Sequence, residues 1–188
     1  MTVEEIEKLE ELCESNEERY FLWYLLDLYN SGYIKTIERG VSIELLPKVL
    51  TTIPKLGKYG QKIKDKTMIV LGNKSYTPDY VVTWNDSAVM DEIVSFKLLH
   101  RPFFIDKDLK TYFEVKPVHD GNGISKREFK TTQKIAYWVK EIYIELVIPQ
   151  EIFQKTFTPQ RYLFTDSGRQ KRKINWEVKN IKEWMKLN

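Results

Sequence analysis

The sequence predicts an α/β protein in which helices flank a mixed β-sheet. Three observations support this prediction. The run YVVTW at 80–84 and the run TYFEVKPV at 111–118 are rich in β-branched and aromatic residues. An amphipathic stretch at 125–142 predicts a helix, and the apolar run YIELVI at 143–148 predicts a buried strand. Because a helix would cross between the strands at 111–118 and 143–148, we expect those two strands to be parallel.

Two helices are expected at the N-terminus, over 2–14 and 16–30. Each begins at a hydroxyl residue with a glutamate three positions later, which is the pattern of a capping box. The two pairs are Thr2 with Glu5 and Ser15 with Glu18. The second helix is apolar nearly all round, so we expect it to be buried, and Gly32 should end it.

Weaker patterns mark the remaining elements. Loose alternation and short β-type runs predict strands at 33–46, 67–71, 88–99 and 162–165, and a short closing helix is expected over 176–187. No repeat, low-complexity tract or linker interrupts the chain. We therefore expect residues 1–188 to form a single domain, with a core over about 15–149 and a basic C-terminal extension over 150–188.

Composition narrows the function classes. Cys13 is the only cysteine, so an internal disulfide is excluded, and with two histidines the chain has no zinc-binding spacing. The acidic N-terminus lacks the basic start and apolar segment of a signal peptide. The apolar run from Tyr20 to Leu26 is too short to span a bilayer. These features favour a cytoplasmic protein, in the host cytoplasm if the chain is phage-encoded.

The charge is unevenly distributed. Residues 1–30 hold nine acids and two bases, a charge of −7. Because the whole chain has a net charge of +3, the remaining residues carry a charge of +10. Residues 153–188 hold nine bases and three acids, a balance of +6. A basic body suits a polyanionic partner such as DNA, although a solvated basic face would have the same composition.

The candidate catalytic residues lie on two expected strands. Glu114 and Lys116 are two positions apart on one strand and therefore share a face. Asp79 follows Pro78, which suits a strand entrance, and precedes YVVTW. Acid-x-Lys occurs three times in the chain, at 108–110, 114–116 and 177–179, but only the middle copy lies within a β-type run. Two carboxylates and a lysine at one sheet edge would suit metal-dependent phosphodiester hydrolysis.

The order of these motifs resembles the PD-(D/E)XK nuclease superfamily, and most closely its small phage nucleases and Holliday-junction resolvases. The resemblance rests on a first-helix acid, Pro78-Asp79, Glu114-Val115-Lys116 and a following helix, and it covers roughly residues 15 to 149. It implies that Asp79 and Glu114 bind Mg²⁺ or Mn²⁺ and that Lys116 positions or activates the attacking water. The first-helix acid would be Glu18 or Glu17. We prefer Glu18, although its capping box explains it equally well.

The resemblance also implies a restriction-endonuclease-like sheet. Thirty-four residues separate Asp79 from Glu114, which is long for a hairpin. We therefore expect extra strands inserted between Trp84 and Lys110. The metal site requires that this insertion leave the two strands adjacent.

Further polar residues are candidates for supporting roles. Gln133 on the next helix would face the site from behind, or face solvent. Basic residues on that helix and in the C-terminal extension would contact DNA phosphates, or form solvated faces. They are Lys126, Lys130, Lys134, Arg169, Lys171, Arg172 and Lys173. His100 and His119 have no evident partners in the sequence and are expected to be ordinary residues.

The sequence therefore predicts a metal-dependent endodeoxyribonuclease, with branched or recombination intermediates among its expected substrates. By resemblance a homodimer is expected, since junction cutting requires two active sites. The alternative is a DNA-binding or recombination accessory protein on the same fold, with weak or no catalysis.

Overall fold

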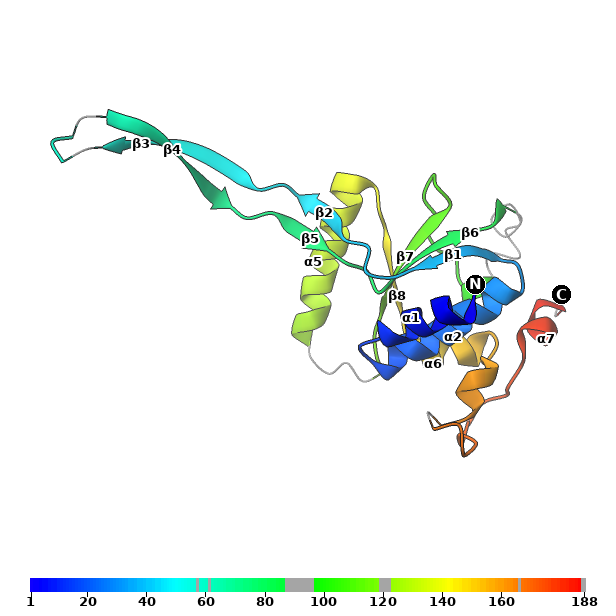
Figure 1. The fold of residues 1–188 in the computed structure, drawn as a ribbon. Helices are drawn as coiled ribbons and strands as arrows, with labels where there is room; N and C mark the ends of the chain where they lie inside the picture. Colours follow the sequence, from blue (N-terminus) through cyan, green and yellow to red (C-terminus); the bar gives the residue numbers. More distant parts are fainter. Residues whose placement is uncertain (57, 61, 87–96, 119–122, 166, 187–188) are drawn as a thin grey trace.

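The computed structural model describes residues 1–188 except 57, 61, 87–96, 119–122, 166 and 187–188. Its centre is a four-stranded mixed sheet in the order β1-β6-β7-β8 (Figure 1). β1 (Ile34–Glu38), β6 (Tyr80–Trp84) and β7 (Lys110–Val115) pair antiparallel in turn. β8 (Ile144–Val147) pairs parallel to β7. The prediction of a mixed α/β fold with helices flanking a mixed sheet is confirmed.

Both faces of the sheet are covered. One face packs on a cluster that includes Phe21, Leu25, Phe113, Val147 and Phe153. The covering helices of this face are α2 (Asn16–Asn30) and α6 (Pro149–Lys155), with α1 (Val3–Glu11), the 3-10 helix η1 (Gln160–Leu163) and α7 (Ile181–Lys186) packed around them. Because both faces are buried, β6 is apolar at nearly every position and not at alternate ones.

The other face is smaller. α5 (Gly123–Lys140) and a two-stranded ribbon of β2 (Ile43–Leu46) and β5 (Lys74–Tyr76) cover it. Leu45, Val81, Tyr112, Phe129 and Ala136 are among the buried residues there. Consecutive residues Val81 and Val82 therefore belong to different clusters, as the alternation of a strand requires.

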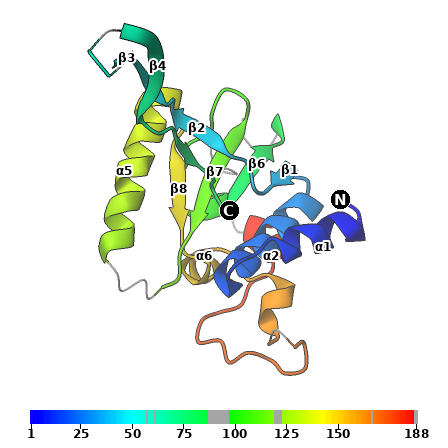
Figure 2. The same cartoon turned by 60° about the vertical axis from the view of Figure 1, so that its left-hand side comes forward.

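A long hairpin leaves the body near α5, and Figures 1 and 2 show it extending well beyond the rest of the chain. We call it the arm; it consists of β3 (Val49–Leu56) and β4 (Lys62–Leu71), which pair with each other. Every described side chain on these two strands is exposed. The sequence signalled only its last part, at 67–71, because Pro54 and a run of lysines obscure the strand pattern of the rest.

The N-terminal predictions hold. Thr2 forms the full capping box with Glu5, and the Ser15 hydroxyl accepts the Glu18 N–H at 3.2 Å. Gly32 follows the end of α2 with a φ of +82°, a conformation that a residue with a side chain rarely adopts. The expected parallel pairing of β7 and β8 is also observed.

The prediction of extra strands between Trp84 and Lys110 is wrong for the part that the structure describes. Residues 97–99 form a helical turn, and residues 101–106 belong to no helix or strand. The physical reason is packing onto the core: Leu98 and Leu99 are buried, and the backbone carbonyl of Leu98 accepts the Tyr24 hydroxyl and not a strand partner. The rest of the expected strand at 88–99 falls on residues outside the described part. The added strands lie ahead of Asp79 instead, in the ribbon and the arm.

The C-terminal elements also differ from the prediction. The expected strand at 162–165 is replaced by η1 and one isolated bridge between Phe164 and Lys171, because Tyr162 turns inward against Phe153. The closing helix begins only at Ile181, not at Trp176. Glu177 and Lys179 therefore lie outside any helix, where they form an ion pair at 3.1 Å. In the described residues no helix is both long and apolar enough to cross a membrane.

Side chains complete the outer edge of β8. The Gln133 side-chain amide donates to the Ile144 carbonyl at 2.6 Å. The Arg101 guanidinium donates to the Leu146 carbonyl at 3.0 Å. These two carbonyls point away from β7, as alternate residues of a strand do. Two outward carbonyls of the last strand therefore have side-chain donors without a fifth strand.

Tyr24 ties three parts of the core together, and its hydroxyl gives a test of the fold. The hydroxyl donates to the Leu98 carbonyl and lies 3.1 Å from the Thr156 hydroxyl, while its ring stacks on Phe157 with 4.2 Å between ring centres. Tyr24→Phe should lower the free energy of unfolding by about 1–3 kcal/mol, because it leaves a buried carbonyl without its donor. Tyr137→Phe, on an exposed ring, is the control and should change it by less than about 0.5 kcal/mol. Urea denaturation measures both, and equal losses would contradict this account.

Candidate active site

Pairing of β6 with β7 brings Asp79 next to the Glu114 strand. Tyr80 is opposite Phe113, so Asp79, one residue earlier, reaches the level of Glu114 and Val115. The Val115 backbone N–H donates to Asp79 Oδ2 at 2.7 Å. The condition that the two strands be adjacent is therefore met, and a main-chain hydrogen bond across the pair fixes the carboxylate of Asp79.

Two neighbours hold the Glu114 carboxylate. Lys116 Nζ lies 2.8 Å from Glu114 Oε1, as expected for side chains that share one strand face. The Tyr76 hydroxyl, from the end of β5, donates to Glu114 Oε2. Burial, and after it the charge of Glu114, raises the pKa of Tyr76, so this phenol stays protonated as a donor. Glu114 is thus oriented from both sides.

The electrostatics of Asp79 are unusual for an aspartate. Burial is the main cause that raises its pKa to about 7 from the usual 3.8. The negative charges of Glu114 and Glu18 raise it further, while the Val115 N–H and the charge of Arg39 oppose the rise. The charges of Glu114 and Glu18 therefore both reach the Asp79 carboxyl, and with a pKa of about 7 it is partly protonated at neutral pH.

Glu18 comes to this site from the first turn of α2. It is buried and forms an ion pair with Arg39, and its carboxylate also accepts from the Glu14 N–H at 3.1 Å and the Ser15 hydroxyl at 3.0 Å. Glu18 therefore both caps α2 and lies near enough to Asp79 for its charge to act there. Between the two glutamates considered, Glu18 is the one whose charge reaches Asp79.

Arg39 and Tyr80 form the wall behind Glu18. The Arg39 guanidinium lies 4.5 Å from the centre of the Tyr80 ring and donates to the Tyr80 hydroxyl at 2.5 Å. The Tyr80 hydroxyl donates in turn to the Glu18 carbonyl at 2.7 Å. This network turns one Glu18 oxygen toward Arg39 and fixes the first turn of α2 against β6.

Sequence reasoning missed Tyr76 and Arg39. Tyr76 stands two residues before Pro78, and its place in YTPDY is the one signal that pointed to it. Arg39 lies just beyond the end of β1 and meets Glu18 only through the pairing of β1 with β6. A buried glutamate requires a cationic partner, but the sequence does not say which of many basic residues supplies it.

The donor set suits a small divalent cation. Among the described residues, no group of three or more His, Cys, Asp and Glu side chains is arranged to hold a metal ion. Mg²⁺, however, needs only one or two protein carboxylates and keeps water or substrate oxygens for the remaining positions. Asp79 and Glu114 supply two hard oxygen ligands, and the raised pKa of Asp79 marks a carboxylate that a nearby positive charge would stabilise.

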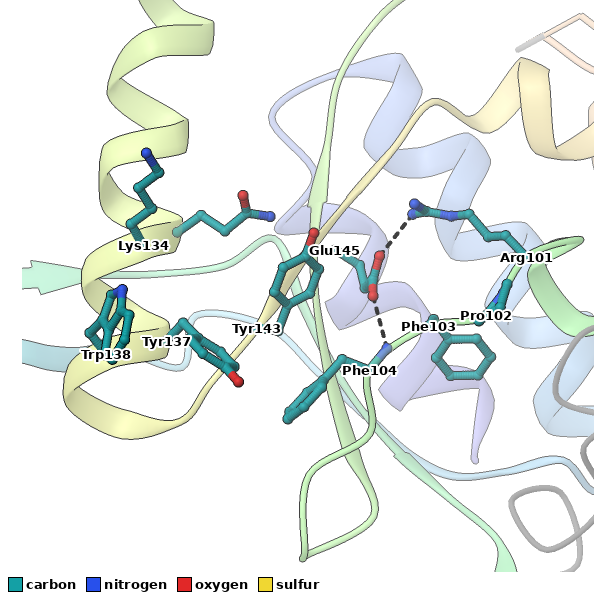
Figure 3. A pocket seen from close by; sticks show the side chains of 10 residues that line it. Arg101, Pro102, Phe103, Phe104, Lys134, Tyr137, Trp138, Tyr143 and Glu145 are labelled. Atoms are coloured by element: carbon teal, nitrogen blue, oxygen red, sulfur yellow. Dashed lines mark hydrogen bonds and ion pairs between the residues drawn. The ribbon is translucent and has the colours of Figure 1, made fainter.

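A separate pocket, away from these residues, lies along the outer edge of β8. It has a volume of about 580 Å³, and Figure 3 shows Phe104, Tyr137, Trp138 and Tyr143 around it. Glu145 is fixed there by Arg101 at 2.9 Å and by the Phe104 N–H at 2.9 Å. We assign the chemistry to the carboxylate cluster and not to this pocket, because Glu145, its one carboxylate, is already paired with Arg101.

Two of the predicted supporting residues line that pocket. Gln133 and Lys134 lie on α5 beside Tyr137, and the Gln133 amide bonds to β8 as described above. Lys130 is exposed on the same helix, and the side chain of Lys126 lies outside the described part. The Gln133 side chain thus bonds to β8, and no contact between it and the carboxylates of Asp79 or Glu114 is observed in the described residues.

The basic residues of the C-terminal extension divide in two. Arg169, Lys171 and Lys173 are exposed. Arg172 is half-buried: it donates to the Phe164 carbonyl at 2.8 Å and lies 4.8 Å from the centre of the Tyr20 ring. Of the two histidines, His100 packs near Trp184, and His119 lies outside the described residues.

Comparison with models of protein families, with curated proteins and with solved structures finds no match for this chain. The case for a function therefore rests on the residues and their geometry.

The raised pKa of Asp79 predicts a pH-dependent gain in stability for Asp79→Asn. Between pH 3.8 and about 7 the unfolded chain ionises Asp79 while the folded chain holds it protonated, so the wild type loses stability as the pH rises. The asparagine variant escapes this loss. Its unfolding free energy in EDTA should match that of the wild type near pH 4 and exceed it by roughly 2 kcal/mol at pH 8.

The matched control is Asp108→Asn, an exposed carboxylate in the turn before β7. Thermal or urea unfolding over a pH series measures both variants. If the two proteins differ in unfolding free energy by the same amount at every pH, the pKa of Asp79 is not raised in the folded protein.

Arg39→Ala tests the buried ion pair. The substitution leaves Glu18 buried without its cation and next to Asp79, so we expect a loss of about 3–5 kcal/mol in unfolding free energy. Adding Glu18→Gln to Arg39→Ala should restore part of that loss, because the uncompensated charge is then removed. Denaturant titration of the two single variants and the double variant gives the coupling, and strictly additive losses would rule it out.

Proposed function

We propose that this chain is a metal-dependent endodeoxyribonuclease of the PD-(D/E)XK kind, with a restriction-endonuclease-like sheet. The single observation that carries the proposal is the convergence of Asp79, Glu114 and Lys116 from two adjacent strands, with Asp79 bonded to the Val115 N–H at 2.7 Å. Thirty-four residues separate Asp79 from Glu114 in the sequence, yet the two lie beside each other across the β6–β7 pair, which supports the proposal. Small phage nucleases and Holliday-junction resolvases remain the members it resembles most.

Asp79 and Glu114 are the residues that would hold Mg²⁺ or Mn²⁺. When bound, such an ion supplies positive charge to the scissile phosphate and lowers the pKa of a water molecule. Hydrogen bonds orient both carboxylates before an ion binds: the Val115 N–H donates to Asp79, and the Tyr76 hydroxyl donates to Glu114. Pre-oriented ligands avoid an ordering cost at the time of binding.

Lys116 carries the next role in the proposed reaction. Its ammonium is held beside Glu114 and its side chain is 29% exposed, so it borders both the carboxylates and the solvent from which water enters. From there it orients the attacking water by hydrogen bonding and offsets the negative charge that develops on the phosphate. Glu18, tied to Arg39, adds negative charge behind Asp79 and raises the affinity of the pair for a cation.

The substrate assignment to DNA rests on charge. Outside the acidic first 30 residues the chain carries a balance of +10, and exposed lysines and arginines occur on α5 and in the C-terminal extension. Contacts from such residues go to phosphates and carry no base information. We therefore propose cleavage with little sequence preference, with branched or recombination intermediates as candidate substrates and a homodimer as the form that would cut a junction.

One observation favours a second candidate, a DNA-binding or recombination accessory protein with weak or no catalysis. Both oxygens of Glu114 are already engaged, by Lys116 and by Tyr76, and the described residues contain no cluster of three ligating side chains. If the ion pair with Lys116 outcompetes metal, the fold would bind DNA without cutting it.

Cleavage of supercoiled plasmid and of a branched substrate tests the proposal. With Mg²⁺ or Mn²⁺ we expect nicked or linear products that EDTA abolishes. Asp79→Ala and Lys116→Ala should each lower the rate at least about 100-fold, because each removes a group that acts on the charge of the transition state.

The matched controls are Lys110→Ala, a lysine at the other end of β7, and Asp108→Asn, and both should cut like the wild type. A second readout avoids activity: Mg²⁺ should raise the unfolding temperature of the wild type but not that of Asp79→Asn. Cleavage at the wild-type rate by Asp79→Ala would contradict the assigned active site. DNA binding without cleavage under every metal would support the accessory protein instead.

A further inference from the structure

The arm carries a face of lysines. In its outer half the register places Lys55 opposite Lys64 and Ile53 opposite Lys66. Cross-strand partners and residues two positions apart share a face. Lys55, Lys64 and Lys66 therefore point to the same side of the hairpin, while Asp65 pairs with Pro54 on the opposite side. We call the three lysines the lysine face.

From this register we propose that the lysine face binds the sugar-phosphate backbone of duplex DNA beside the cleavage site. The inference rests on the proposed function for its substrate, and it adds a contact surface, in the arm, that neither the motif nor the basic C-terminal extension supplies.

Electrostatics favour an anionic partner for this face. Like charges directly opposite each other on a hairpin destabilise it in water, so the Lys55–Lys64 pair is costly to the free arm. A polyanion removes that repulsion on binding. Lys64 and Lys66 lie two residues apart on β4, a separation of about 6.8 Å. This is comparable to the axial rise of roughly two base pairs, so both lysines can follow one phosphate backbone.

The arm is built as a surface for a partner and not as part of the core. A two-stranded hairpin alone is marginally stable in water, yet every described side chain on β3 and β4 is exposed. Tyr59, near the tip, is 84% exposed and places an aromatic ring where the arm would meet a ligand. A second copy of this chain fits the lysine face poorly, because two equivalent faces would bring six ammonium groups together.

The arm is also continuous with the candidate active site. β4 leads through two residues into β5, which ends at Tyr76, and the Tyr76 hydroxyl donates to Glu114. With eight residues in β3, the arm spans about 26 Å at the rise of a β-strand. Lys66 and Lys64 lie ten and twelve residues before Tyr76, about 33 to 40 Å of extended chain. A duplex that follows the arm from Asp79 and Glu114 therefore meets the lysine face within roughly 10 to 12 base pairs.

Equilibrium binding in EDTA tests the inference without cleavage. The full-length triple variant Lys55→Ala, Lys64→Ala, Lys66→Ala is titrated with a fluorescent DNA duplex at several salt concentrations. We expect at least roughly 10-fold weaker binding. The negative slope of log affinity against log salt should become shallower by about 2 to 3, since each lost phosphate contact removes about 0.9 from its magnitude.

Two further variants locate the effect. The triple lysine-to-arginine variant keeps the charge and should bind like the wild type. The variant Lys35→Ala, Lys107→Ala, Lys182→Ala removes three exposed lysines from β1, the turn before β7 and α7, and its slope should stay near that of the wild type. Circular dichroism of all variants checks that each is folded.

The outcomes separate the two proposals. Wild-type binding by the alanine triple, or an equal loss in the control triple, overturns the lysine face while plasmid cleavage remains a separate result. Tighter binding of an RNA duplex of the same sequence overturns the assignment to DNA. A change of sedimentation mass in the alanine triple overturns it in favour of self-association. If the alanine triple has a shallower salt slope and the wild type cuts no plasmid, the lysine face is supported and only the proposed nuclease activity is wrong.

Discussion

The antiparallel pairing of β6 with β7 is the constraint on which the rest of the site depends. It is the pairing that sets Asp79 against the Val115 N–H and beside Glu114. A one-residue slip would turn Glu114 and Lys116 into the core and expose Phe113 and Val115. The packing of Phe113 on Phe21 at 5.2 Å and of Trp84 against Thr111 through a 2.8 Å hydrogen bond therefore fixes the geometry of the carboxylates as well as the fold.

The cluster that this pairing creates is electrostatically unbalanced. Three carboxylates face two cations, Arg39 and Lys116, and the burial of Asp79 makes the imbalance costly. A protein that only needed a stable sheet would be more stable with a neutral residue at position 79. Strain of this kind at one point in an otherwise well-satisfied structure is typical of a functional site, and the contacts of Glu18, Tyr76 and Val115 hold the charges in place despite it.

Sequence reasoning recovered the sheet strands and helices around the site because their patterns are local. The caps at Thr2 and Ser15, the strand YVVTW and the Glu114-Val115-Lys116 face follow from spacing alone. Residues 97–105 were mistaken for part of a strand region because Leu98, Leu99, Phe103 and Ile105 pack into the core beside α2, which no local period reveals. Arg39 and Tyr76 escaped because each gains its role from a partner distant in sequence. Most of the arm escaped because Pro54 and a run of lysines obscure its strand pattern.

The closed edge of β8 has a consequence for how the molecule behaves at high concentration. An open strand edge is a template on which another chain can add a strand and begin to aggregate. On β8 the outward carbonyls of Ile144 and Leu146 are already occupied by Gln133 and Arg101. A neighbouring molecule would have to displace both side chains before it could extend the sheet. The last strand is thus shielded by residues from α5 and from the segment before β7, which keeps the sheet that carries the carboxylates at four strands.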